Sequence, residues 1–333
     1  MNTSTNPPGA AFDRELAPTE RELLVRSAIL APSMHNTQPW QFRFRHRTIE
    51  VHRDRSLELP AEDPDGRLAM IGVGAAVFNI RVAAATLARA TVTVLLPDPE
   101  RRPTLAAEVT LAPGLGCGTD LAGLFLDLPQ RRTNRQPFSS RRLPRAVQEA
   151  LELAAIAEGT RLRWANHEQV RWLQHVASDA DHADGRDLHR IVERGSWVGG
   201  DRDRDGVPSA SLGPRSAELP SPVRDLAVDP IDGVRGTALF EPDPTLAILA
   251  TTLDNPPNWL AAGQALQRVL LVATHYELAA SLLNQPVEHS EFRGLLHDPH
   301  DGWTATQVVL RLGYGPTVPP TPRRPHEEFI LDD

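Results

Sequence analysis

Two long segments of small and apolar residues most constrain the fold of this 333-residue chain. The first covers residues 67–90 and contains Gly74, and the second covers residues 259–283 and contains Gly263. Each precedes a strand-like run that ends in Gly-x-Gly. Such a repeated pattern indicates a weak internal duplication. We therefore predict two long helices whose small-residue faces pack closely on each other, at the centre of a pseudo-twofold arrangement.

Shorter elements are expected around these helices. A helix is predicted to begin at a capping box, with Thr19 as the cap and Glu22 three residues later, and to end before Pro32. Residues 40–44 and 48–52 alternate apolar and polar side chains, which predicts a hairpin. Three further runs are predicted to be strands, the first of them buried: residues 91–96, 104–111 and 304–312.

Two polar motifs have the residue types of a binding site. Residues 31–40 read APSMHNTQPW, and the hydroxyl and amide groups of this loop suit a sugar-like polyol and the edge of a heterocycle. Residues 131–138 read RRTNRQPF and place three guanidiniums and a hydroxyl within five positions. The guanidinium fork matches phosphate oxygens bidentately, so this motif predicts a phosphate clamp. The alternative is a solvated run of arginines, because Arg141, Arg142 and Arg145 follow.

The paired motifs resemble the flavin-binding motifs of the nitroreductase family. The resemblance extends to a late Gly313-Tyr314-Gly315 followed by a basic tail. In the ordinary family the arginine motif comes first in a shorter chain, whereas here the order is reversed, which resembles the Acg branch of fused, degenerate halves. The resemblance implies an α+β nitroreductase-like fold, an intramolecular pseudo-dimer with mixed or antiparallel sheets around long central helices.

This resemblance also implies a domain organisation. Residues 1–18 are expected to form a flexible tail, residues 19–128 a first half and residues 129–333 a second half. Residues 177–244 would be an inserted lid or arm. The loop position of the second half, residues 158–161, lacks a Pro-Ser motif. One complete site for one FMN per chain is therefore expected, built from both halves.

The resemblance assigns site residues in three groups. The FMN phosphate and ribityl chain are expected to contact Arg131, Arg132, Thr133 and Arg135, with added charge from Arg323 and Arg324. The isoalloxazine ring is expected to contact Pro32, Ser33, Met34 and Asn36, with Gln38 just behind that loop. The flavin N5 is expected to face the backbone of Pro286, Val287, Glu288 and His289, where His289 replaces a glycine of the family and adds a Cβ that narrows substrate access.

Two functions follow from the resemblance. The first is an FMN-dependent oxidoreductase that takes electrons from NAD(P)H and reduces a nitro compound, a quinone or a similar small acceptor. The flavin carries this chemistry, so no catalytic side chain and no metal is assigned. The alternative is a non-enzymatic protein that binds or sequesters FMN beneath a closed lid. A flavin-free structural or regulatory protein would require the arginine motif to be accidental.

Composition limits partners and compartment. The net charge of −8 and the pI of about 5.8 argue against nucleic acid as a partner. Cys117 is the single cysteine, so no internal disulfide forms, and a reducing, cytoplasmic compartment is expected. The N-terminal residues do not resemble a secretory signal, and the sequence contains no run of 18 uninterrupted apolar residues. We therefore expect no membrane span. A monomer or a homodimer remains open.

Three weaker patterns are interpreted as structural. Gly72-Val73-Gly74 lies inside a predicted helix, so close helix packing explains it better than a dinucleotide loop. Residues 201–206 resemble the start of a calcium loop but lack its final glutamate. Three histidines follow one another at seven-residue spacing: His175, His182 and His189. This spacing predicts a solvated helix face, because two metal ligands on one helix need a spacing of three or four residues.

Overall fold

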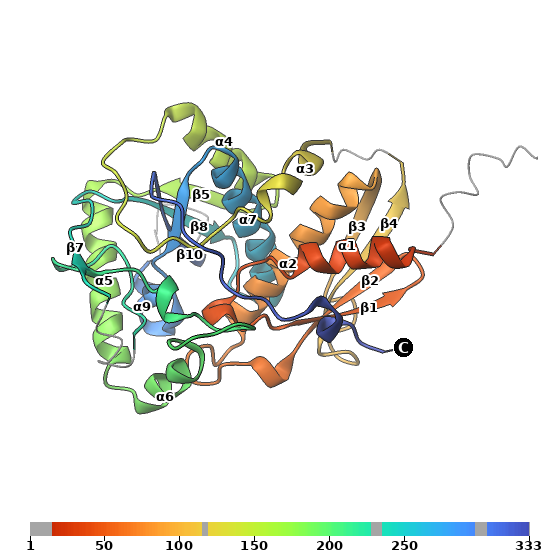
Figure 1. Cartoon of the computed structure of the whole chain (residues 1–333), viewed down its shortest axis with the longest axis horizontal. Coiled ribbons are helices and arrows are strands. Elements are labelled where there is room, and N and C mark those ends of the chain that lie inside the picture. Colours follow the sequence, from red (N-terminus) through yellow and green to blue (C-terminus); the bar gives the residue numbers. More distant parts are fainter. Residues whose placement is uncertain (1–14, 115–118, 228–234, 297–304, 333) are drawn as a thin grey trace, which may run out of the picture.

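The computed structural model describes residues 15–114, 119–227, 235–296 and 305–332. Figure 1 shows two antiparallel sheets on opposite sides of the molecule with two long helices between them. Helices and sheets are thus segregated, as expected for an α+β fold. The predictions for residues 1–14 of the flexible tail and for Cys117 lie outside the described residues.

The first sheet has the strand order β1-β2-β4-β3, and all its pairs are antiparallel. Its strands are β1 (Trp40–Arg45), β2 (Thr48–Arg53), β3 (Arg89–Leu95) and β4 (Leu105–Pro113). The predicted hairpin is confirmed as β1 and β2. The prediction of a buried strand over residues 91–96 is wrong, because β3 is an edge strand whose Val92 and Val94 are 59% and 46% exposed.

The second sheet has the order β5-β8-β10-β9 and is also antiparallel. Its strands are β5 (Arg161–Trp164), β8 (Thr245–Thr251), β9 (Ala279–Leu282) and β10 (Ala305–Gly313). The central strand β10 is buried along nearly its whole length. This sheet packs on the long helix of the second half, as the first sheet packs on the long helix of the first half.

The two long helices are α2 (Arg67–Thr86) and α7 (Pro256–His275), and their backbones touch where they cross. A Cβ on Gly74 would lie 2.2 Å from the Leu260 carbonyl oxygen, and one on Gly263 would lie 2.0 Å from that of Ile71. The predicted close packing of small-residue faces is confirmed. α2 is long and apolar enough to cross a membrane, but 89% of its most apolar window is buried, as expected of a core helix.

Both long helices are shorter than predicted. The run over residues 67–90 leaves the helix after Thr86, and the run over residues 259–283 leaves it after His275. Each helix is followed within two residues by a non-glycine residue in the left-handed region, Ala88 with φ 53° and Glu277 with φ 57°. The chain then turns directly into β3 or β9.

Shorter helices flank the core. They are α1 (Pro18–Ala28), α3 (Thr119–Gly123) and α4 (Arg145–Ile156), with single turns η2 (Met34–Asn36), η3 (Arg55–Leu57) and η4 (Phe125–Asp127). The predicted cap at Thr19 is wrong: α1 begins two residues earlier, and Glu20 accepts a hydrogen bond from the Ala17 N–H at 2.7 Å. Pro18 occupies the first helical position, where its missing N–H costs nothing.

Residues between β5 and β8 form a folded insertion rather than a structureless loop. Its elements are α5 (His167–Asp184), α6 (Leu188–Trp197), η5 (Ser209–Ser211), β6 (Arg215–Ser216) and β7 (Thr237–Ala238). Its first helix, α5, begins ten residues before residue 177, where the insertion was predicted to start. The three histidines of the seven-residue series are solvent-exposed, as predicted. They do not share one helix face, because His189 lies on α6 rather than α5.

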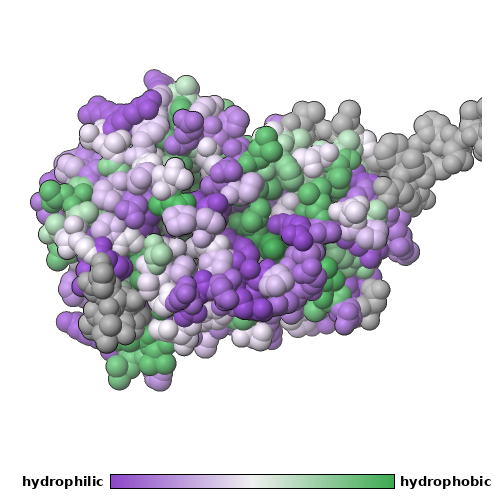
Figure 2. Space-filling view, in the orientation of Figure 1, coloured by the Kyte–Doolittle hydropathy of each residue, from purple (hydrophilic) through white to green (hydrophobic). Residues whose placement is uncertain are grey.

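The C-terminal tail connects the two halves. After β10 it passes over the middle of the molecule to the first sheet, where Phe329 is buried and the Leu331 N–H donates to the Phe42 carbonyl at 2.8 Å. Figure 2 shows hydrophilic residues gathered along the path of this tail. The last short helices are α8 (Gln285–Glu288), α9 (Ser290–Leu295) and η7 (His326–Phe329).

Candidate functional site

A cavity of about 310 Å³ lies where the two halves, the insertion and the tail meet. α2 contributes Leu68, Ile71 and Gly72 to its wall, and α7 contributes Leu266. The insertion contributes Val207 and other residues near η5, and the tail contributes residues 318–321 and Arg323. The volume falls within the range of small-molecule sites.

The loop after α1 forms one wall of this cavity. Four residues that were assigned to the isoalloxazine ring line the cavity, namely Pro32, Ser33, Met34 and Asn36. His35, which had no assignment, lines it as well. His35, Asn36 and Gln38 have φ values of 47°, 58° and 55°, an unfavourable conformation for residues other than glycine. Such local strain is typical of functional loops and persists only when the surroundings hold it.

Distant segments hold this loop in place. The Asn36 side-chain amide donates to the Gly206 carbonyl at 3.0 Å and to the Pro322 carbonyl at 2.9 Å. Gly72 of α2 leaves room below the loop, since a Cβ there would lie 3.4 Å from both the Pro32 oxygen and the Ser33 Cβ. The insertion and the tail are therefore part of the wall's support.

Arginines form another part of the wall. All four residues assigned from the second motif line the cavity, namely Arg131, Arg132, Thr133 and Arg135. Arg323 of the tail lines it too. Burial lowers the pKa of Arg131 and of Arg135 to about 10 and the pKa of Arg323 to about 9. Within the described part of the chain, no carboxylate forms an ion pair with the guanidinium of Arg131, Arg132, Arg135 or Arg323.

Their hydrogen bonds go mainly to neutral oxygens. Arg323 donates to the Ile29 carbonyl at 2.7 Å and to the Asn36 amide oxygen at 2.8 Å, and Arg135 donates to the Ser211 carbonyl at 3.2 Å. The Nε atoms of Arg131 and Arg132 are buried without a partner among the described residues. An unsatisfied buried donor is costly. The cavity thus has excess positive charge and free N–H groups, which suit a phosphate.

Other assigned residues lie behind the cavity wall. Gln38 is fully buried, and its side-chain oxygen accepts from the Arg324 N–H at 3.1 Å, so it supports the loop from behind, as expected. Arg324 does not line the cavity, unlike the prediction that it faces the phosphate. Its guanidinium donates to the Thr37 carbonyl at 2.5 Å and to the Gln38 carbonyl at 3.1 Å, which turns its charge toward the loop backbone.

The loop assigned to the flavin N5 is only partly in the wall. Glu288 lines the cavity, whereas Pro286 and Val287 are buried and His289 is turned away from it. The Nε2 atom of His289 lies within hydrogen-bonding distance of Asp184 Oδ1, 2.8 Å away. The expectation that His289 narrows the access of a substrate therefore differs from the structure, because its side chain belongs to a neighbouring ion-pair cluster.

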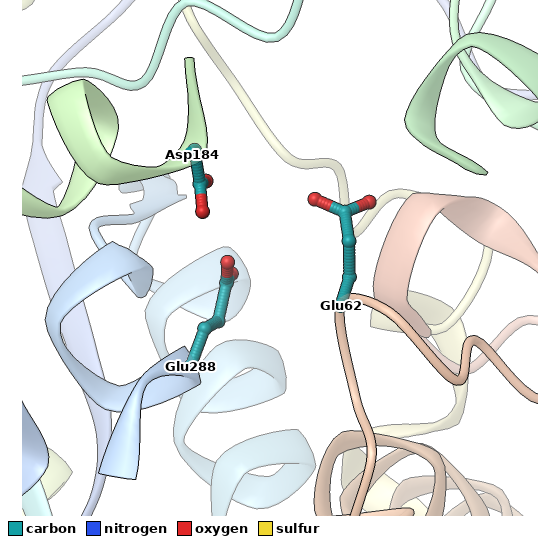
Figure 3. Close-up of side chains that lie close together, drawn as sticks. All are labelled: Glu62, Asp184 and Glu288. Carbon is teal, nitrogen blue, oxygen red and sulfur yellow. The ribbon is translucent and has the colours of Figure 1, made fainter. Parts of the chain in front are cut away.

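This ion-pair cluster centres on three carboxylates from distant segments, Glu62, Asp184 and Glu288, whose nearest oxygens lie within 4.8 Å of one another (Figure 3). Three carboxylates could hold a cation, but Arg194 already pairs with two of them and Arg224 pairs with all three. The positive charge is thus supplied by guanidiniums. The cluster is an ionic network of the protein itself and not a metal centre.

The network keeps its carboxylates ionised. Burial alone would raise the pKa of Glu62, but the hydrogen bond from His35 and the charges of Arg224 and Arg194 outweigh it and lower that pKa to about 2. The pKa of Asp184 is held well below its usual range in the same way, with His289 and three arginines against burial. Sequence reasoning missed this network because its three carboxylates, at positions 62, 184 and 288, are far apart in the sequence and form no local motif.

Comparison with known proteins identifies relatives along nearly the whole chain. No family model matches the sequence. A Mycobacterium tuberculosis H37Rv protein named "putative NAD(P)H nitroreductase" is 30% identical over 329 residues, covering 94% of this chain and 91% of that protein. The "putative NAD(P)H nitroreductase acg" of the same organism is 27% identical over 313 residues, covering 92% and 93%. A solved structure called a "putative nitroreductase" from Anabaena variabilis has a TM-score of 0.40 at 11% identity, over 88% of this chain and 72% of that one.

Proposed function

This chain belongs to the nitroreductase family, and on that premise we propose that it binds FMN in the cavity between its halves and transfers electrons from NAD(P)H to a small acceptor such as a nitro compound or a quinone. The relatives' names support the electron donor and the reaction class. Several solved nitroreductases contain FMN, which is the cofactor we assign.

The single observation that carries the proposal is the unbalanced positive charge of the cavity. Arg131, Arg132, Arg135 and Arg323 converge on one space without a carboxylate partner in the described chain. A phosphate would accept hydrogen bonds from the free Nε atoms and neutralise the guanidiniums at once. FMN carries such a phosphate, and the residues present fit it.

The other walls suit the remaining parts of the cofactor. The polar groups of Ser33 and Asn36 can meet heteroatoms of the ring, and the apolar side chains of Met34 and Ile71 can pack on its face. When bound, FMN accepts a hydride from NAD(P)H and passes the electrons to the acceptor. Val207 of the insertion lies over this space and helps to exclude water.

The proposal includes one cofactor per chain and two halves that meet near residues 128–129. The turn between α4 and β5 corresponds to the loop between α1 and β1, but it carries Glu158 instead of a Pro-Ser motif. Glu158 lies 2.5 Å from Arg81 Nη1 and 2.9 Å from Arg268 Nη1. This turn thus has an ion-paired carboxylate in place of the loop that lines the cavity in the first half, which supports a single site.

One observation favours an FMN-sequestering function as the second candidate. The cavity of about 310 Å³ is at the small end of ligand sites, and both the insertion and the tail close it. A flavin that fills this space would leave little room for an acceptor above its ring. Binding without turnover would then be the function.

An anaerobic spectral experiment tests the proposal. The purified protein, loaded with FMN, should show flavin absorbance that bleaches on addition of NADPH or NADH and returns with a quinone or nitro compound. Bleaching by dithionite but by neither nicotinamide would support sequestration and exclude the oxidoreductase. A protein that retains no FMN after gel filtration would contradict both.

A further inference from the structure

His35 lines the cavity and has a buried ionic partner on its other side. The residue is 6% exposed, and its Nε2 lies 2.5 Å from Glu62 Oε2. Its backbone has a φ of 47°, in the left-handed region. The imidazole is therefore in the cavity wall, held by a carboxylate from the segment that precedes α2.

Glu62 fixes which ring nitrogen exchanges a proton. Its side chain is fully buried and also accepts from Arg194, with Nε at 2.9 Å and Nη2 at 2.6 Å from Oε1, while Arg224 Nη2 lies 3.5 Å from the same oxygen. An ionised carboxylate only accepts hydrogen bonds, so Nε2 of His35 must carry a proton and donate it. The second nitrogen, Nδ1, has no partner among the residues that the structure describes.

We propose that His35 is a catalytic proton donor to the acceptor that is reduced in the cavity, and that Glu62 is its positioning residue. A carboxylate behind an imidazole holds its tautomer and stabilises the imidazolium, as in other buried carboxylate–histidine pairs. This inference rests on the proposed oxidoreductase function. It adds a protein group to a reaction for which sequence reasoning assigned none.

The chemistry balances with a quinone as acceptor. Reduction by a hydride adds two electrons and one hydrogen to the quinone and leaves one negative charge on an oxygen. The step starts from a His35 ring that carries a proton on both nitrogens. The O–H bond to the quinone oxygen forms as the N–H bond at Nδ1 breaks, which gives the neutral hydroquinone and a neutral imidazole that keeps its proton on Nε2. Water then returns a proton to Nδ1. The Nε2 hydrogen bond to Glu62 stays in place throughout.

A second buried histidine offers a matched control. His52 on β2 is also 6% exposed, and its Nε2 lies 3.2 Å from Glu50 Oε2, but it does not line the cavity. His52→Gln therefore reports what the loss of a buried histidine–glutamate pair does to the fold alone. His35→Asn suits the left-handed backbone, and His35→Gln matches the size of the ring.

The decisive measurement compares two acceptors on the FMN-loaded enzyme. A quinone needs a proton, whereas ferricyanide takes single electrons and no proton. We expect both His35 variants to bind FMN and to bleach with NADPH like the wild type. We further expect them to reduce the quinone roughly 10²-fold more slowly and ferricyanide at the wild-type rate. His52→Gln should leave both rates unchanged.

Other outcomes would overturn the proposal. Equal loss with both acceptors would assign His35 a structural role in the loop, and an unchanged quinone rate would remove it from the reaction. Absence of bleaching in the wild type would instead be a failure of the proposed function. Ring ¹⁵N NMR on the oxidised protein gives a readout without turnover: we expect a proton on Nε2 of His35, and a neutral ring with a bare Nε2 would contradict the role of Glu62.

Discussion

At the scale of single residues, the buried arginines of this protein fall into two kinds. Arg311 is fully buried, but Glu241 pairs with it at 2.6 Å. Arg67 lacks such a pair, yet the Gln307 and Val287 carbonyls and the Gln307 side chain satisfy its guanidinium. Arg131 and Arg132 each donate from one Nη to a carbonyl, but their Nε atoms stay without partners beside a cavity. A ligand that brings negative charge would remove this cost.

Arg131→Ala should weaken FMN binding, because a charge-assisted hydrogen bond to the phosphate is lost. Such bonds contribute about 1.5–3 kcal/mol, so we expect the dissociation constant to rise roughly 10- to 100-fold. The cofactor-free variant should be at least as stable as the wild type, since it no longer buries an unpaired charge. Fluorescence titration with FMN and urea unfolding measure the two effects.

Arg141→Ala is the matched control for that variant. Arg141 is exposed and stacks on the Tyr314 ring with its guanidinium carbon 4.1 Å from the centroid, outside the cavity lining. It should bind FMN with the wild-type dissociation constant. Equal affinity of the Arg131 and Arg141 variants would remove the phosphate clamp from the account.

At the scale of elements, the crossing of α2 and α7 decides how the halves meet. Gly74 and Gly263 let the two backbones touch, and the Gln267 side-chain amide donates to the Asn79 oxygen at 2.7 Å inside the same interface. The Asn79 amide also donates to the Ser27 carbonyl at 2.9 Å, whereas the Gln267 side-chain oxygen is buried without a partner among the described residues. The crossing is therefore set by the backbone contact at the two glycines more than by this polar pair. The interface therefore specifies one relative position of the halves, and the cavity wall depends on it.

Gly263→Ala should destabilise the protein although alanine is the better helix former. Its Cβ would lie 2.0 Å from the Ile71 oxygen, so α2 and α7 would have to separate, at a cost of about 1–3 kcal/mol. Gly294→Ala in α9 meets nothing within 4 Å and should be neutral or stabilising by about 0.5–1 kcal/mol. Urea unfolding of both variants tests this. A Gly263 variant as stable as the wild type would show that the helices can shift freely.

The same elements show what the sequence could and could not reveal. The crossing at Gly74 and Gly263 was predictable because small residues recur locally, at helical spacing, in both segments. The ends of these helices were not, because Ala88 and Glu277 adopt left-handed φ values that only tertiary packing selects. The two polar motifs each form a continuous stretch, so the sequence could name them as candidates, and residues of both line one cavity.

The rest of the cavity wall depends on long-range pairs. Glu62 meets His35 across 27 residues and Arg194 across 132, and neither pair leaves a local signal. The role of Arg324 was misjudged for a related reason. Its position next to Arg323 suggested one shared target, but adjacent side chains in an extended tail point to different sides.

At the scale of the whole molecule, the ionic network fastens the insertion to both halves. Arg194 of α6 binds Glu62 of the first half, and Arg224 binds Glu288 of the second half at 2.8 Å. Both also bind Asp184 of α5. Removing one partner from a buried network leaves an uncompensated charge and is strongly destabilising. The cover over the cavity therefore depends on carboxylates that remain ionised.

This dependence predicts a loss of stability in acid. The Glu62 pKa of about 2 lies below its ordinary value of 4.5, so the unfolded chain takes up the proton first. The stability that Glu62 contributes is complete above about pH 4.5 and is lost as the pH falls toward 2. At 1.36 kcal/mol per pH unit the full loss is about 3 kcal/mol, an order of magnitude to which Asp184 adds in the same direction.

Urea unfolding between about pH 3.8 and pH 3 measures this loss, because two opposing groups titrate higher. Burial raises the pKa of Asp63 from 3.8 to about 6 and also raises the pKa of Asp181, which favours the folded state as the pH falls to 3.8. Glu62→Gln should be less stable at pH 7 and should show a shallower decline below pH 4.5, since its amide cannot titrate. Glu149→Gln, which alters only an exposed pair with Arg145, should keep the wild-type slope. If the Glu62 variant instead declined as steeply as the wild type, the insertion would be held by its apolar contacts, and acid would not open the cavity.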